Sequence, residues 1–144
     1  MKSASDPKIQ GAWKAACLAR SHAHAPYSRF KVGVALKIKG RDELIPGCNV
    51  ENASYGATVC AERVAFQNAT AQIGSFEPEY LVLVTDTDPV VAPCALCLQV
   101  MAEFCSGDFP IYVSNLEGVG EKVRFGDLLP RPFVKSQINT IPGV

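Results

Sequence analysis

The spacing of apolar positions changes along the chain, and each spacing predicts one kind of element. After Asp6-Pro7, a pair typical of a capped helix start, apolar residues recur at helical intervals and predict a helix to about residue 23. Residues 30–38 alternate between large apolar side chains and lysine or small ones, which predicts a strand. A turn leads to a second strand over about 44–50. Pro46 places that strand at a sheet edge, because proline cannot donate to a ladder.

The second half of the chain predicts two more helices and three more strands. Residues 60–71 and 94–105 carry small and apolar side chains at helical spacing. The run 80–85 is almost wholly apolar, as expected of a central parallel strand buried on both faces. Two further strands are predicted at 111–114 and 122–125. A hairpin followed by helical crossovers indicates an α/β fold, with three layers α/β/α around a five-stranded mixed sheet.

Composition and charge narrow the class of protein. The 144 residues are 48% hydrophobic and 19% charged, which suits one globular domain spanning residues 1–144. The net charge is zero, so we expect neither nucleic acid nor a membrane surface as a partner. Residues 1–41 are basic and the remainder is acidic, which fits either complementary patches between subunits or two solvated faces. The N-terminal residues lack the apolar core of a signal peptide, so we expect a cytoplasmic protein.

The six cysteines indicate metal chemistry more than disulfides, because a reducing compartment keeps thiols free. Cys60 opens the second predicted helix, and Cys94 and Cys97 open the third as a Cys-x-x-Cys pair. In sheets of this kind, helix N-termini meet beside the carboxyl ends of strands, so the three thiols can converge. Three thiolates can hold one Zn²⁺ tetrahedrally and leave a position for water. The remaining cysteines are interpreted as small buried hydrophobes: Cys17, Cys48 and Cys105.

Two charged residues follow Cys60 on the same predicted helical turn. Glu62 is a candidate proton shuttle, although a glutamate in a first turn can also simply complement the helix dipole. Arg63 can reach back toward the sulfurs and offset the net charge of −1 that three thiolates leave on Zn²⁺. The alternative for Arg63 is an ordinary surface position. Two other classes stay open: a zinc protein whose metal only holds the fold, and a thiol redox protein using Cys94 and Cys97.

With these residues identified, the sequence resembles the small homotetrameric cytidine deaminases. Their zinc centre uses cysteines together with a glutamate that is not a ligand, which acts as general acid and base. The resemblance covers about residues 25–133. It depends on five blocks in the family's order: 25–33 (APYSRFKVG), 47–56 (GCNVENASYG), 59–63 (VCAER), 93–99 (PCALCLQ) and 128–130 (LLP). It implies a cytidine deaminase-like fold and hydrolysis of cytidine and 2′-deoxycytidine to the uridine forms.

The resemblance also implies roles for individual residues. Asn49 and Glu51 match the pair that hydrogen-bonds the ribose hydroxyls, and Phe30 matches a residue packing beside the base. The backbone around Ala61 would read the base edge, and Gln99 would donate to the metal thiolates. Three residues match positions that line a neighbouring subunit's site: Ala53, Tyr55 and Phe133.

Three positions depart from the family's pattern. Ala95 stands where the family usually has glycine, and Leu98 stands where it usually has arginine, which removes a cation near Cys97. Pro132 stiffens the segment before Phe133. These departures leave open a modified cytosine nucleoside or a blasticidin-type aminonucleoside as the substrate.

Overall fold

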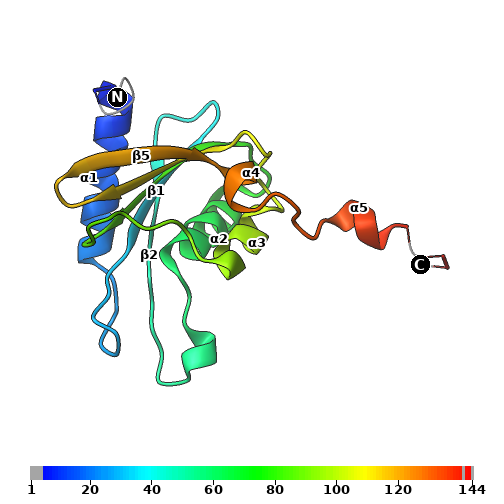
Figure 1. Ribbon diagram of the computed structural model, residues 1–144, viewed down its shortest axis with the longest axis horizontal. Helices are drawn as coiled ribbons and strands as arrows, with labels where there is room; N and C mark the ends of the chain where they lie inside the picture. The colour runs from blue at the N-terminus through cyan, green and yellow to red at the C-terminus, as the bar shows by residue number, and fades with distance from the viewer. Residues whose placement is uncertain (1–4, 141, 144) are drawn as a thin grey trace.

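The computed structural model describes residues 5–140 and 142–143, which form one sheet flanked by helices (Figure 1). In chain order the elements are α1 (Pro7–Ser21), β1 (Gly33–Ile38), β2 (Leu44–Cys48), the 3-10 turn η1 (Tyr55–Ala57), α2 (Ala61–Ile73), β3 (Pro78–Thr85), α3 (Ala95–Met101), β4 (Pro110–Asn115), β5 (Gly118–Arg124), α4 (Phe125–Leu128) and α5 (Lys135–Ile138). No helix within this described part is long and apolar enough to cross a membrane.

The five strands lie in the order β2-β1-β3-β4-β5. The pair β3 and β4 is parallel, and the other three pairs are antiparallel, so the sheet is mixed as predicted. The strand predicted from the apolar run 80–85 is β3, which occupies the centre and is buried along its last six residues. The strand that contains Pro46 is β2, at one edge, where its missing N–H breaks no ladder.

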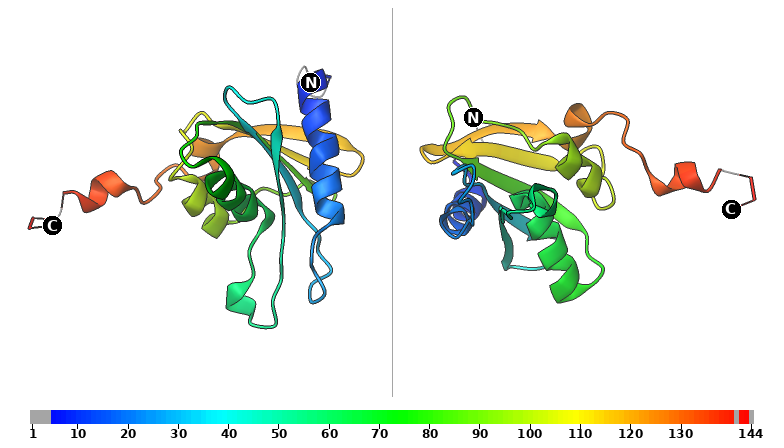
Figure 2. Two further views of the ribbon diagram at one scale, coloured as in Figure 1. Left: turned by 180° about the vertical axis from the view of Figure 1, so that it is seen from behind. Right: turned by 90° about the horizontal axis from the view of Figure 1, so that it is seen from below.

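Helices cover both faces of the sheet, which Figure 2 shows when the sheet is viewed along its edge. On one face α1 packs its alanines Ala12 and Ala16 against Val82 and Val84 of β3. On the other face α2 and α3 enclose the larger apolar core, in which Phe66 is fully buried. Alternate residues of the strands therefore feed two separate cores, as a sheet buried on both sides requires.

Two glycines in the sheet allow the helices on either face to pack closely against it. A side chain at Gly33 would overlap the backbone of α1 at Ala16. A side chain at Gly47 of β2 would overlap the Ala61 carbonyl oxygen and lie 2.8 Å from the Cβ atom of Ala65. The first turn of α2 can therefore lie directly on β2, which fixes where the residues of that turn point.

Several boundaries differ from the sequence prediction, among them the end of β2 at Cys48 and the start of β5 at Gly118. The first strand begins at Gly33 and not at residue 30, because residues 30–32 are bound by the side chain of Asn49. The third helix ends at Met101 and continues as turns to Cys105. Residues 130–140, called the tail below, leave the body and include α5, which the sequence pattern did not predict (Figure 1).

Candidate metal centre and active site

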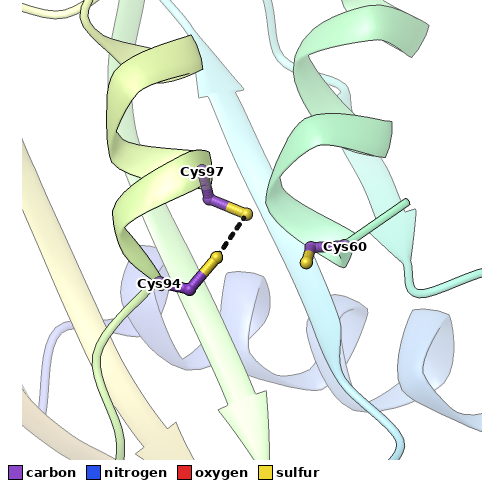
Figure 3. Close-up of side chains that lie close together, drawn as sticks. All are labelled: Cys60, Cys94 and Cys97. Carbon is purple, nitrogen blue, oxygen red and sulfur yellow. Dashed lines mark hydrogen bonds between the residues drawn. The ribbon is translucent and has the colours of Figure 1, made fainter. Parts of the chain in front are cut away.

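Three thiols meet between the first turns of α2 and α3 (Figure 3). Cys60 is the N-cap of α2 and Cys94 is the N-cap of α3, while Cys97 lies one turn into α3 and is fully buried. The sulfur atoms all lie within 4.8 Å of one another, and those of Cys94 and Cys97 are 3.4 Å apart. The sequence prediction that these thiols converge is therefore met, and all six cysteines are free.

The surroundings of Cys60 favour negative charge on its sulfur. The hydrogen bond from the Cys97 thiol, aided by Arg63, lowers the pKa of Cys60 to about 5. That same bond with Cys60, together with burial, raises the pKa of Cys97. Arg63 donates from Nη2 to the Cys60 sulfur at 3.5 Å and to the Thr58 carbonyl at 3.4 Å. Its buried Nε atom has no hydrogen-bond partner within the described structure.

This donor set fits a zinc ion. Three thiolates are ligands that Zn²⁺ prefers, and a dication would stabilise the deprotonated form of all three thiols. The additional thiolate charge would also give the unpaired Nε of Arg63 an electrostatic partner. Because these residues supply three protein ligands and not four, one coordination position is left for solvent.

A carboxyl group lies beside the thiols. Glu62 is 5% exposed, and its Oε2 atom accepts from the Cys97 sulfur at 3.6 Å. Burial raises the pKa of Glu62, and the nearby Cys60 thiolate raises it further. A carboxyl with a raised pKa can hold and return a proton near neutral pH, which is what general acid-base chemistry needs.

A cavity of about 250 Å³ opens next to this carboxyl. Its wall is apolar at Phe30, Val32 and Leu83 and polar at Glu62, Asn49 and Glu51. Other lining residues are Ser28, Thr58, Cys60, Thr85, Val91, Ala92 and Cys94. The cavity therefore joins two metal-binding thiols and the candidate shuttle to the residues expected to bind ribose and base.

Asn49 and Glu51 hold the loop that carries Phe30. The amide of Asn49 accepts from the Val32 N–H at 2.8 Å and donates to the Phe30 carbonyl at 2.7 Å. The Oε1 atom of Glu51 accepts from the N–H groups of Tyr27 and Ser28 at 3.0 Å each.

Ser28 completes this arrangement, and the sequence analysis gave it no role. Its hydroxyl donates to Oε2 of Glu51 and accepts from the Phe30 N–H at 3.0 Å. Ser28 lies inside the block 25–33 that resembles the family, and this is the feature of the sequence that points to it.

Four of the predicted substrate-binding residues lie outside the cavity lining. Ala53 and Tyr55 are exposed on the loop between β2 and α2, and Phe133 is exposed on the tail. Ala61 is the first residue of α2 and is fully buried.

Gln99 differs from the prediction. Its side chain binds the backbone of Phe133, and within the described residues it makes no hydrogen bond to a cysteine sulfur. Its neighbour Leu98 is buried in the core with Met101, so the family's arginine is replaced here by an apolar contact.

A mixed sheet between helical layers, with three thiols and a buried carboxyl at two helix N-termini, defines a zinc-dependent deaminase. The chain belongs to the family described as "Cytidine and deoxycytidylate deaminase zinc-binding region", whose pattern matches residues 7–113. The zinc centre of the family accounts for the group Cys60, Cys94 and Cys97.

Individual relatives agree with this assignment. The chain is 43% identical to the cytidine deaminase of Sporosarcina psychrophila, over 84% of this chain and 88% of that one. It is 44% identical to the cytidine deaminase of Halalkalibacterium halodurans, over 88% and 94% of the two chains. The crystal structure of cytidine deaminase from Burkholderia pseudomallei superposes with a TM-score of 0.78 at 41% identity, covering 85% and 97%. The redox and structural-zinc alternatives explain neither this similarity nor the position of Glu62.

Proposed function

We propose that this protein hydrolyses cytidine and 2′-deoxycytidine to uridine and 2′-deoxyuridine with release of ammonia, in pyrimidine salvage. The observation that carries the proposal is the buried Glu62 carboxyl, which borders the cavity beside the three thiols. Cys60, Cys94 and Cys97 would hold the ion. When bound, Zn²⁺ supplies a Lewis acid that turns a water molecule into a nucleophile at neutral pH.

Glu62 would then move the protons of the reaction. Its Oε2 atom takes a proton from the attacking water and delivers it to N3 of the cytosine ring, while the oxygen adds to C4. The carboxylate then takes the remaining proton of the added hydroxyl and passes it to the amino group. The C4–N bond breaks as the C4=O bond forms, and ammonia leaves. The raised pKa of Glu62 suits both halves of this exchange, because the carboxyl is easily protonated and easily regenerated.

The ribose end of the substrate would meet Asn49 and Glu51. Three hydrogen bonds from residues 27–28 leave Glu51 with acceptor capacity for one hydroxyl donor. A carboxylate accepts from a diol and repels a phosphate, which favours nucleosides over nucleotides. Phe30 supplies an apolar wall for the base, and the backbone N–H of Ala61 is a candidate donor to the base edge.

We further propose that the enzyme acts as a homotetramer in the cytoplasm. The exposed side chains Ala53, Tyr55 and Phe133 would each complete a neighbouring subunit's site, since none lines the cavity of its own chain. Six free cysteines suit a reducing compartment. The zero net charge supports small nucleosides, and not nucleic acids or membranes, as partners.

The decisive experiment measures zinc content and ammonia release from cytidine, 2′-deoxycytidine, CMP and free cytosine. We expect about one zinc per chain and release from the two nucleosides, with little from CMP. Activity confined to other aminated nucleosides would instead favour a modified or blasticidin-type substrate.

A Glu62→Gln variant tests the proton shuttle. It should fold and keep its zinc, but lose about 10²–10⁴-fold in kcat because the amide cannot carry a proton. Full activity in this variant would refute the role of Glu62 as the proton carrier.

A further inference from the structure

The tail is attached to the body through one side chain, that of Gln99. Its Nε2 atom donates to the Phe133 carbonyl at 2.8 Å, and the Phe133 N–H donates to its Oε1 atom at 3.3 Å. Among the described residues, these are the only hydrogen bonds between the tail and the rest of the chain. The tail otherwise extends away from the body (Figure 1).

This pairing fixes the backbone position from which the Phe133 ring projects. The amide of Gln99 binds both polar groups of the Phe133 backbone, much as a neighbouring strand would. Pro130 and Pro132 have fixed φ angles and make the preceding segment stiff. The backbone of Phe133 is therefore held in place, while its ring is 61% exposed and free to contact another chain.

Gln99 and Cys97 point to different sides of α3, although they are only two residues apart. Residues two apart on a helix point about 200° away from each other. Cys97 is fully buried and faces the thiol cluster, whereas Gln99 is half-buried and reaches the tail. The helix that carries a metal ligand on one side therefore carries the anchor for an exposed aromatic ring on the other.

We propose that Gln99 is a positioning residue that anchors Phe133, so that its ring can close the base site of a second copy of this chain. The inference rests on the proposed function, in which that ring covers the nucleoside from a neighbouring subunit. Gln99 then controls substrate affinity in the neighbour and takes no part in binding the metal. Because Gln99 lies on α3, the Phe133 ring that closes a neighbour's site moves together with the metal-binding helix of its own subunit.

The Gln99→Leu variant of the full-length zinc enzyme tests this anchor, because it removes both hydrogen bonds at similar volume. We expect KM for cytidine to rise about tenfold, as the loss of one or two net hydrogen bonds predicts, with kcat within about twofold. Zinc content should be unchanged. The Gln99→Glu variant still accepts from the Phe133 N–H, so its KM for cytidine should lie between those of wild type and Gln99→Leu. Glu103→Gln is the matched control, since this exposed side chain just beyond α3 makes no hydrogen bond in the described structure.

A double-mutant cycle of Gln99 and Phe133 distinguishes the anchoring of Phe133 from a general structural effect of the Gln99 substitution. The variant Phe133→Leu should raise KM on its own, and adding Gln99→Leu should raise it no further, because the anchor would have nothing left to position. Additive effects, a loss of zinc, or a fall in kcat at unchanged KM would overturn the proposal.

Hydrogen exchange tests the anchor without any activity. The Phe133 amide should exchange faster in Gln99→Leu than in wild type, since it loses its acceptor. Unchanged exchange would refute the anchor itself. A wild-type protein that carries zinc but does not deaminate cytidine would refute the proposed function, while the exchange result would still stand.

Discussion

Arg29 is held in an uncommon backbone conformation between Ser28 and Phe30, two residues that line the cavity. Its φ of 59° lies in the left-handed region, which a residue with a Cβ atom seldom occupies. On either side, Glu51 and Ser28 bind residues 27–30, and Asn49 binds Phe30 and Val32. These hydrogen bonds can offset the cost of that conformation. The two residues proposed to bind ribose thus also set the position of Phe30.

The double role of Glu51 predicts a pH effect for Ser28→Ala. The hydrogen bonds from Ser28 hold the pKa of Glu51 below its ordinary value, so the carboxylate stays charged to a lower pH. Removing the hydroxyl should raise the pKa toward the ordinary value. The rise of KM for cytidine on acidification should then begin at a higher pH in the variant, over the range below about pH 6.

Steady-state profiles of KM against pH for Ser28→Ala and wild type measure this shift. Ser75→Ala is the control, because Ser75 is exposed and its side chain makes no hydrogen bond in the described residues. A profile that stays in place, or moves to lower pH, would show that Glu51 does not bind the substrate as a carboxylate.

For single residues, the sequence predicted which side chains belong to the site better than it predicted their hydrogen-bond partners. The thiols were predictable because Cys60, Cys94 and Cys97 stand at helix starts, and helix starts gather at one edge of such a sheet. The partner of Gln99 was not predictable. It joins residues 34 positions apart, and depends on the path of a proline-rich tail that has no hydrophobic period.

Among the elements, α2 contributes most to the site, and its placement depends on Gly47. Any side chain there would overlap the Ala61 carbonyl oxygen and crowd the Cβ atom of Ala65. We expect Gly47→Ala to lower the free energy of unfolding by about 3 kcal/mol, as overpacking against fixed backbone does. It should also lower zinc content, because a displaced α2 carries Cys60 away from α3.

Urea unfolding and zinc analysis of the same preparations test this expectation. Gly11→Ala is the matched control, since a side chain at this exposed position in α1 would meet nothing within 4 Å. That change should raise stability by about 0.5–1 kcal/mol, because alanine favours a helix more than glycine does. If Gly47→Ala had the stability and zinc content of wild type, α2 could move away from β2 without cost and the prediction would be wrong.

The helices and strands were predictable wherever burial requires apolar residues at a regular spacing along the chain. The continuous apolar run became the central β3, and the edge position of β2 followed from Pro46. The predicted boundaries were wrong where a side chain binds the backbone. At residues 30–32 the side chain of Asn49 makes the hydrogen bonds that a neighbouring strand would otherwise make. Helix α5 lies on the exposed tail and buries none of its residues, so no apolar stripe marks it.

For the molecule as a whole, the segments that project from the body include the loop between β2 and α2 and the tail (Figure 1). Each carries an exposed aromatic side chain, Tyr55 at 76% and Phe133 at 61% exposure. Large exposed aromatic groups on projections suit contacts with other chains better than a free monomer surface. The proposed homotetramer would bury both.

Zinc removal separates the ion's catalytic role from its contribution to the fold. Helices α2 and α3 have apolar packing of their own, since Phe66 and Met101 are fully buried without the metal. The metal-free protein should therefore keep its far-UV circular dichroism and unfold cooperatively, but at a lower temperature. Binding at 100 to 1,000 times Kd stabilises by about 3–4 kcal/mol, which corresponds to a Tm change of roughly 10 °C for a chain of this length.

The measurement compares thermal unfolding before and after chelation, with a reductant present because the sulfurs of Cys94 and Cys97 lie 3.4 Å apart and could oxidise. Activity should vanish with the metal and return when Zn²⁺ is added back. Loss of all cooperative structure on chelation would mean that the ion holds α2 and α3 in place. An unchanged Tm would mean that the three thiols do not bind it in the native protein, and the catalytic role of Glu62 would then lose its physical basis.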